Sequence, residues 1–337
     1  MQRKYNIPIF VPHRGCPFDC VFCNQKTITG QSEGANPDMV TETIEEYLKT
    51  MPEGAAIETA FFGGSFTGIP IEEQNALMDR AVPYIKKGRI DGIRLSTRPD
   101  YIDEKILDNL KAHYVTTIEL GVQSMDEEVL KRSNRGHSAE DVVRAAELIK
   151  SYGFSLGLQM MTGLPGDTPE KSIYTAERII ALEPQCVRIY PTLTIHGTYL
   201  EKMYERGEYV PETLEEAVEL CKTLVLMFEK AGITVIRTGP QPTEEINEGA
   251  SVAAGPFHSA FGELVESAIY HDIISEKLKG MSEDAVVYVN PREISKVCGN
   301  KRGNIKRLIS EFGHDIAVKG ESSLKKREVR VIAAKEA

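Results

Sequence analysis

The feature that most constrains the fold is a regular alternation of short β-rich runs and amphipathic helical stretches along residues 5–194. The expected strands are apolar almost throughout and lie at residues 6–11, 55–62, 92–97, 116–122, 154–161 and 185–193. The expected helices lie between them, at residues 39–51, 71–87, 104–113, 139–153 and 170–182. Because near-continuous apolar strands that alternate with helices are typical of a parallel sheet covered by helices, the sequence predicts the α/β class.

Six such units predict a partial (βα)6 barrel of the TIM type rather than a compact doubly wound sheet, because glycines and polar residues follow every expected strand. In either architecture the ligand binds at the carboxyl ends of the strands. The segments that follow the strands are a cysteine loop and residues 63–67, 96–100, 121–124, 162–166 and 190–192. Each segment alone is an ordinary turn, whereas the whole series on one rim indicates a site.

Three parts are expected along the chain: a barrel core at residues 1–200, its helical extension at residues 201–280, and a small basic α+β module at residues 281–337. The module has the order β-α-turn-α-β-β, which resembles a KH RNA-binding module, where a GXXG turn clamps a nucleic-acid backbone. Residues 299–302 occupy that turn here, and Arg302 stands where the second glycine would be. A small structural cap with a solvated basic face is the alternative.

Charge is distributed unevenly between the module and the rest of the chain. From residue 291 to the end, twelve Lys and Arg stand against six acids, so this segment carries +6 in a chain whose net charge is -10. A basic segment on an acidic body indicates a polyanionic partner. The expected contacts with nucleic acid are Lys301, Arg302 and Lys306, because cations on a tight turn at a helix N-terminus favour phosphates.

The compartment is predicted from what the sequence lacks. Its apolar runs are much shorter than a membrane span, and its start has no apolar leader segment, so we expect a cytoplasmic protein without membrane attachment. In a reducing compartment, clustered cysteines indicate metal or redox groups before they indicate disulfides.

The cysteine loop contains Cys16, Cys20 and Cys23, spaced C-x3-C-x2-C, and no fourth cysteine follows until Cys186. A structural zinc site needs four protein ligands, and no histidine lies downstream at finger-like spacing, although His13 just upstream is available as a fourth ligand. An iron–sulfur cluster held by three thiolates leaves one iron open to another ligand. Because S-adenosylmethionine (SAM) and iron–sulfur clusters both serve radical chemistry, their combination would give the three-cysteine count a purpose.

The cysteine motif, with Phe22 just before its last cysteine, resembles the signature of the radical SAM superfamily. Together with FFGGSFTG, IRLSTRPDYID, GVQSMDEEVLKRSNRGHSAED, GLQMMTGLPGDT and VRIYPTLTIHGT, it resembles the radical domain of the Elongator catalytic subunit over residues 5 to about 280. A weaker resemblance to the oxygen-independent coproporphyrinogen oxidases lies in GVQS, RGHS and GLPG. No acetyl-coenzyme A loop is recognisable after residue 280, so uridine carboxymethylation by the full Elongator route is not expected.

The resemblance implies a [4Fe-4S] cluster that is ligated by Cys16, Cys20 and Cys23 and completed by the amine and carboxylate of SAM. It implies reductive cleavage of SAM to a 5'-deoxyadenosyl radical, hydrogen abstraction from a substrate, and an electron donor such as flavodoxin or ferredoxin. The cofactor-binding residues that it implies are Phe22, Gly63, Gly64, Ser65, Ser96, Arg98, Gln123, Arg135 and Gln159. Without the motif context, Arg98 and Arg135 would be expected to form surface ion pairs.

Three functions therefore stay open. The first is a radical enzyme that modifies RNA, with transfer RNA as the expected substrate. The second is a radical enzyme that acts on a small molecule and carries the basic module as a structural cap. The third is an RNA-binding protein whose metal is structural or only carries electrons. The basic segment and the KH-like pattern favour the first function.

Overall fold

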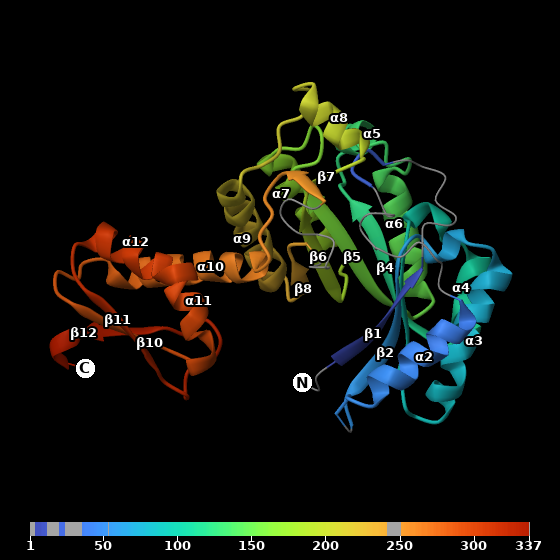
Figure 1. The fold of residues 1–337 in the computed structure, drawn as a ribbon, viewed down its shortest axis with the longest axis horizontal. Helices are drawn as coiled ribbons and strands as arrows, with labels where there is room; N and C mark the ends of the chain where they lie inside the picture. Colours follow the sequence, from blue (N-terminus) through green and yellow to red (C-terminus); the bar gives the residue numbers. More distant parts are fainter. Residues whose placement is uncertain (1–3, 12–19, 24–35, 53, 241–250, 337) are drawn as a thin grey trace. The chain divides into compact units, whose positions relative to one another are not determined.

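The computed structural model describes residues 4–11, 20–23, 36–52, 54–240 and 251–336 (Figure 1). Contacts within the chain divide it into two units, Met1–Thr213 with Met227–Phe257 and Leu214–Leu226 with His258–Ala337. The boundaries predicted after residues 200 and 280 stay predictions. Within the described ranges, no helix combines the length and the apolar character needed to cross a lipid bilayer.

The first unit is built on a seven-stranded sheet in the order β1-β2-β3-β4-β5-β6-β8, in which every neighbouring pair is parallel. Its strands are β1 (Lys4–Val11), β2 (Ala56–Gly63), β3 (Gly92–Thr97), β4 (Val115–Gln123), β5 (Ser155–Thr162), β6 (Cys186–Pro191) and β8 (Thr234–Thr238). The six predicted strands and the partial barrel are confirmed. The seventh strand, β8, is not among the six predicted, and the sequence did not indicate its place in this sheet.

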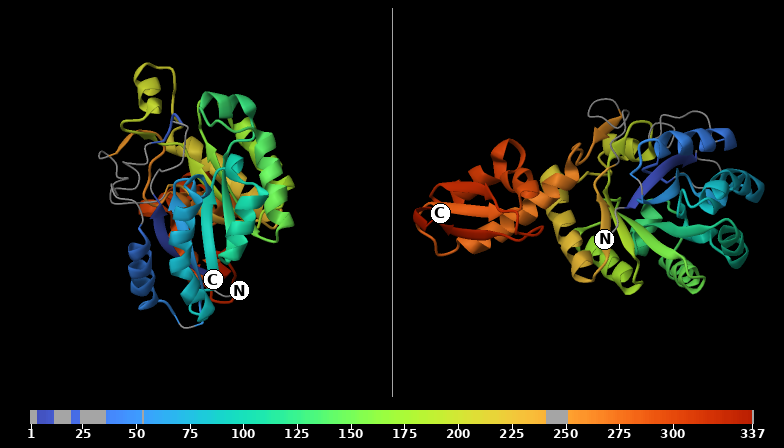
Figure 2. Two further views of the ribbon diagram at one scale, coloured as in Figure 1. Left: turned by 90° about the vertical axis from the view of Figure 1, so that its right-hand side faces the viewer. Right: turned by 90° about the horizontal axis from the view of Figure 1, so that it is seen from below.

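Helices pack on the outer face of this sheet (Figure 2). They are α2 (Pro37–Leu48), α3 (Ile71–Lys86), α4 (Glu104–Ala112), α6 (Ala139–Ser151) and α7 (Pro169–Ala181). Several of them begin where a side chain accepts a hydrogen bond from the first turn, at the N-caps Asp103, Ser138 and Thr168. Because such caps satisfy the free N–H groups of a helix start, short polar signals in the sequence fix where these helices begin.

Two shorter helices and a small ribbon complete the first unit at the carboxyl ends of the strands. They are α5 (Glu127–Arg132), α8 (Tyr199–Glu205) and the antiparallel pair of β7 (Thr194–Ile195) with β9 (Val252–Ala254). The sequence did not predict the ribbon, because each of its strands is too short to show a period.

The second unit has a three-stranded mixed sheet in the order β11-β10-β12, in which β10 is parallel to β11 and antiparallel to β12. Its elements are α10 (Phe261–Leu278), β10 (Ala285–Val289), α11 (Ile294–Cys298), α12 (Gly303–Phe312), β11 (Ile316–Gly320) and β12 (Arg330–Ala333), with the first part of α9 (Leu214–Lys230). From β10 onward, this is the predicted order of elements. One core joins Tyr270 and Ile274 of α10 to Val287 of β10 and Leu308 of α12. The resemblance to a KH module stays a prediction.

Candidate active site

The carboxyl ends of β2, β3, β4 and β5 border a pocket of about 130 Å³ in the first unit. Its lining residues are Cys20, Phe22, Cys23, Gly63, Gly64, Ser65, Ser96, Thr97, Arg98, Gly121, Gln123, Arg135 and Gln159. The pocket thus gathers all nine predicted cofactor-binding residues and two of the three predicted cluster ligands, while Cys16 lies outside the described residues. Their ligand-binding roles stay predictions. Sequence reasoning did not single out Thr97 and Gly121 as binding residues.

The turn that carries Cys20 and Cys23 is held from two sides. The Cys23 N–H donates to the Cys20 carbonyl at 2.9 Å, which closes the turn. The Val21 N–H donates to the Ser133 carbonyl at 3.1 Å, and the Val21 carbonyl accepts from the Leu200 N–H of α8 at 2.7 Å. Val21 also packs with the fully buried Leu200 in a small apolar cluster. The position of the cysteines therefore depends on α8, which sequence reasoning did not connect with the site.

The glycine loop after β2 brings backbone atoms to the pocket wall. Gly63 has a φ of 111°, a conformation that side chains rarely adopt, and a Cβ there would lie 2.8 Å from the Val11 carbonyl oxygen. The N–H of Gly64 donates to the same carbonyl at 3.0 Å. A residue with a side chain at position 63 would therefore push β1 away from β2 at the pocket.

Arg98 and Arg135 are buried, so the surface ion pairs expected from each arginine alone are wrong. Arg98 is 1% exposed, and its Nε and Nη2 both donate to the carboxylate of Asp100 at 2.9 Å. Arg135 is 8% exposed; its Nη2 donates to the Gly121 carbonyl at 2.8 Å and its Nη1 lies 3.5 Å from the Cys20 sulfur. Arg135 therefore ties the end of β4 to one of the predicted cluster ligands.

Some polar atoms of the pocket wall are buried without a hydrogen-bond partner among the described residues. Among them are the Nε of Arg135, a donor, and the Oε1 of Gln123, an acceptor. Gln123 also has a φ of 66° at the end of β4, which is uncommon for a residue with a side chain. Because buried polar groups nearly always form hydrogen bonds, a donor and an acceptor without a partner in the same pocket indicate that a polar ligand binds there.

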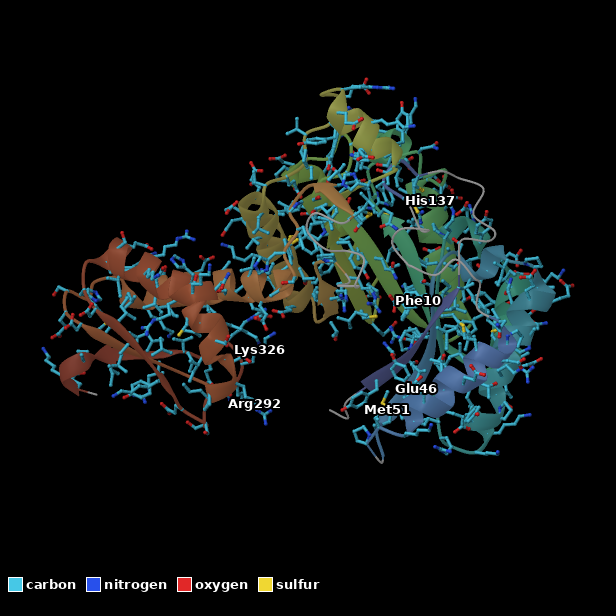
Figure 3. All side chains as sticks on the ribbon, viewed as in Figure 1. Phe10, Glu46, Met51, His137, Arg292 and Lys326 are labelled. Atoms are coloured by element: carbon cyan, nitrogen blue, oxygen red, sulfur yellow. The ribbon has the colours of Figure 1, made fainter. Side chains whose placement is uncertain are left out.

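His137 lies beside the end of β4 and is 6% exposed (Figure 3). Its Nε2 lies 3.2 Å from the Val122 carbonyl, so this nitrogen carries the proton and donates. Burial, together with the charges of Arg135 and Arg98, lowers the pKa of His137 to about 3. The imidazole is therefore neutral at physiological pH and supports the pocket wall without adding charge.

Glu119 is the centre of a buried charge network on the concave face of the sheet. Its carboxylate accepts hydrogen bonds from Arg94 Nη1 at 2.7 Å, from Arg188 Nε at 2.6 Å and from Gln159 Nε2 at 2.9 Å. Arg94 also donates to Glu58 at 3.0 Å. Gln159 lines the pocket, so the network reaches the pocket wall through this one amide.

The carboxylates of the network stay ionised. Burial opposes the charged form of Glu119, but hydrogen bonds and charge from Arg188 and Arg94 hold its pKa below the usual range. Burial likewise opposes ionisation of Glu58, and Arg94 holds the pKa of that carboxyl low. Sequence reasoning missed the network, although single charged residues within otherwise apolar strands were a signal for it.

Comparison with known proteins identifies the family. Residues 10–179 match the model of the radical SAM superfamily, and residues 184–271 match that of the radical SAM C-terminal domain. The chain belongs to the radical SAM superfamily. It is therefore an enzyme of the class that the cysteine motif predicted, and this class implies a [4Fe-4S] cluster and SAM as cofactors.

Curated relatives of this radical SAM chain include proteins named for transfer RNA and for Elongator. The chain is 33% identical over 218 residues to the tRNA uridine(34) acetyltransferase of Methanocaldococcus infernus, and this alignment covers 58% of this chain and 40% of that protein. It is 28% identical over 213 residues to Elongator complex protein 3 of Homo sapiens, covering 57% and 39%. The chain thus spans about two fifths of the length of these relatives, and its resemblance to the Elongator subunit is confirmed.

Solved structures show the same fold. The archaeal Methanocaldococcus infernus Elp3 with an N-terminal deletion superposes with a TM-score of 0.64 at 25% identity, covering 81% of this chain and 64% of that one. Coproporphyrinogen III oxidase (HemN) from Escherichia coli superposes with a TM-score of 0.50 at 18% identity, covering 68% and 53%. The second likeness concerns the fold alone.

Proposed function

We propose that this radical SAM enzyme modifies RNA, with transfer RNA as its substrate. The observation that carries the enzymatic half is the pocket itself, where two cysteines, a glycine loop and two open polar atoms meet at the carboxyl ends of the strands. Support for the RNA half comes from the relative named a tRNA uridine(34) acetyltransferase and from the basic segment that begins at residue 291.

The donor set fits the cofactors of the family. Cys20 and Cys23, with Cys16, would hold the cluster; Gly63 and Gly64 would offer backbone groups close to SAM. The open donor of Arg135 and the open acceptor of Gln123 suit a ligand that carries both carboxylate and amine or hydroxyl groups. When bound, the cluster and SAM supply one-electron reductive cleavage and a carbon radical that takes hydrogen from the substrate.

The other pocket residues would position and shield these cofactors. Phe22 would pack against the adenine, and Ser65 and Ser96 would provide hydroxyl groups at the pocket wall. Arg98 is locked by Asp100, so it would present a fixed charge rather than a mobile side chain. Gln159 is anchored through its Nε2, which leaves its Oε1 as an acceptor on the pocket side. A preorganised wall of this kind excludes water from reactive species.

The second unit would hold the RNA backbone. Lys301 and Arg302 are exposed and both have left-handed φ values, 49° and 61°, in the turn before α12. They and Lys306 form no ion pair with any residue that the structure describes, whereas Lys326 and Arg327 of the same unit are paired with Glu266. Unpaired exposed cations are free to neutralise phosphates.

The first experiment is anaerobic reconstitution of the full chain with iron and sulfide, followed by dithionite and SAM. The assay measures 5'-deoxyadenosine with and without bulk transfer RNA. We expect cleavage of SAM that rises with transfer RNA. Cleavage that is indifferent to RNA would refute the RNA substrate, and no cleavage by a loaded cluster would refute the radical enzyme.

A second experiment tests the RNA contacts by charge reversal. Lys301→Glu/Arg302→Glu should weaken binding of transfer RNA and flatten the dependence of log K on log salt by about 1.4–1.8, because two phosphate contacts are lost. Lys86→Glu/Lys87→Glu on the first unit is the matched control, since it changes the net charge equally at two adjacent exposed lysines. Equal salt slopes for the two double variants would count against the basic turn.

A further inference from the structure

Arg188 lies on the concave face of the barrel sheet, the side on which the pocket opens. Its guanidinium sits 5.2 Å from the ring centroid of Phe62 on β2, a strand that is separated from β6 by three others. It also binds Glu119 on β4 through two donors, at 2.6 and 3.1 Å. Side chains from non-neighbouring strands meet in this way only across the concave side of a curled sheet.

Arg237 of β8 lies directly beside Arg188. The two residues are register partners in the β6–β8 pair, so their side chains leave the sheet on the same face. Tyr190, two residues along β6, shares this face, and its phenol is an electrostatic neighbour of both Arg188 and Arg237. Gln159 pairs with Arg188 on the other side and lines the pocket. The two arginines and the tyrosine are therefore adjacent to the pocket.

Positive charge is in excess on this face. Among the residues that the structure describes there, two carboxylates, Glu58 and Glu119, stand against three arginines, because Arg94 and Arg188 are joined by Arg237. Arg237 donates to the Pro240 carbonyl at 3.0 Å and has no ion pair with a described residue. Burial and the charge of Arg188 lower the pKa of Arg237, as expected for a partly buried cation beside another cation. Partly buried charge of one sign is costly unless a counter-charge joins it.

We infer that Arg188, Arg237 and Tyr190 bind an oxyanion of the substrate, a phosphate or carboxylate group, and so hold the substrate beside the cofactor pocket. This inference rests on the proposed radical function, which requires a substrate at that place. Guanidinium groups match such oxyanions with paired donors. Arg237 would supply such a pair, while the Nη1 of Arg188, whose Nε and Nη2 bind Glu119, and the phenol of Tyr190 would add further donors. Phe62 forms an apolar wall next to Arg188, suited to the carbon skeleton that carries the anion.

Two sources of the oxyanion are distinguished by choice of probe. Isothermal titration calorimetry of the reconstituted full chain, without reductant, measures the affinity for three probes. They are the dinucleotide UpU, whose single charge is a backbone phosphodiester, succinate, and neutral uridine. Tighter binding of UpU than of uridine would assign the site to an RNA phosphate. Binding of succinate in place of UpU would assign it to a small-molecule acid. Equal binding of all three probes, or of none, would overturn the inference.

Variants locate the binding at Arg237. Arg237→Gln should weaken binding of the preferred anion by about 10- to 100-fold, and Arg237→Lys should weaken it less, because a charge is kept but the paired donors are lost. Arg178→Gln is the control, an exposed arginine that also lies beside a tyrosine, Tyr174, but on α7 outside the barrel. Wild-type affinity in Arg237→Gln would refute the site. Arg237-dependent anion binding by a chain that never cleaves SAM would instead refute the proposed function and leave this site in place.

Discussion

Replacement of His137 by glutamine should remove a specific part of the pH dependence of stability in the first unit. The folded chain holds the pKa of His137 at about 3, against a value of 6.5 for an unperturbed imidazole. Between these values the unfolded chain binds a proton that the folded chain does not. The stabilising effect of the neutral imidazole is therefore complete above pH 6.5 and is lost as the pH falls toward 3.

The size of the effect follows from the shift. Lowering the pH from 7.5 to 5.0 should cost the wild-type unit about 2 kcal/mol of unfolding free energy through this one group. Glutamine keeps an N–H donor near the Val122 carbonyl but does not titrate, so His137→Gln should lack this loss. The carboxylates Glu58 and Glu119 stay ionised, because hydrogen bonds and charge from the neighbouring arginines hold their pKa values below the usual range.

Native-state hydrogen exchange read by mass spectrometry on peptides from β4 reports the first unit alone, which suits a chain of two units. The measured quantity is the opening free energy at pH 7.5 and 5.0 for wild type, His137→Gln and the control His113→Gln. The control should behave as wild type, because His113 is a partly exposed residue at the end of α4. A difference between the two pH values that is the same in wild type and His137→Gln would refute the reasoning.

Three further substitutions test the framework of the site. Glu119→Gln should lower the unfolding free energy of the first unit by about 3–5 kcal/mol, because the buried arginines Arg94 and Arg188 lose their shared carboxylate. Urea titrations followed by circular dichroism measure this change. A change below about 1 kcal/mol would contradict a stabilising role of the charge network. Gly63→Ala should lower both the unfolding free energy and the affinity for SAM, measured by titration. Gly88→Ala is the control, with a φ of 66° and nothing within 4 Å of its added Cβ, and it should lower the unfolding free energy less. Similar SAM affinities of the two variants would contradict a close approach of the Gly63 backbone to SAM. Leu200→Ala should cost about 2–5 kcal/mol and reduce the iron bound per chain after reconstitution, and a full iron content would separate α8 from the cysteine turn.

The sequence predicted the barrel well because its strands are apolar almost throughout and several of its helices begin with recognisable caps. The motifs that follow the strands, such as residues 63–67 and 121–124, fall around one pocket because parallel strands end at one rim. These features are local in sequence, so patterns of a few residues carry them.

What the sequence did not indicate depends on pairs that are distant along the chain. The partners Glu119 and Arg188 are 69 residues apart, and their charges lie in strands that otherwise read as apolar core. The place of β8 in the sheet and the contact of Leu200 with the cysteine turn are likewise set by tertiary packing. No periodicity in one segment contains such information.

The curl of the sheet has a mechanical consequence. In the described part of the chain, β1 and β8 are the two edge strands of a curved sheet. The width of this sheet is therefore not fixed by a closed ring of hydrogen bonds between strands, as it would be in a closed barrel. Instead, contacts of Arg188 on β6 with Glu119 on β4 and with Phe62 on β2 link non-neighbouring strands across the concave face. An anion bound at Arg188, as inferred above, would compete with Glu119 for this side chain, so we expect occupancy of the site and the width of the barrel to change together.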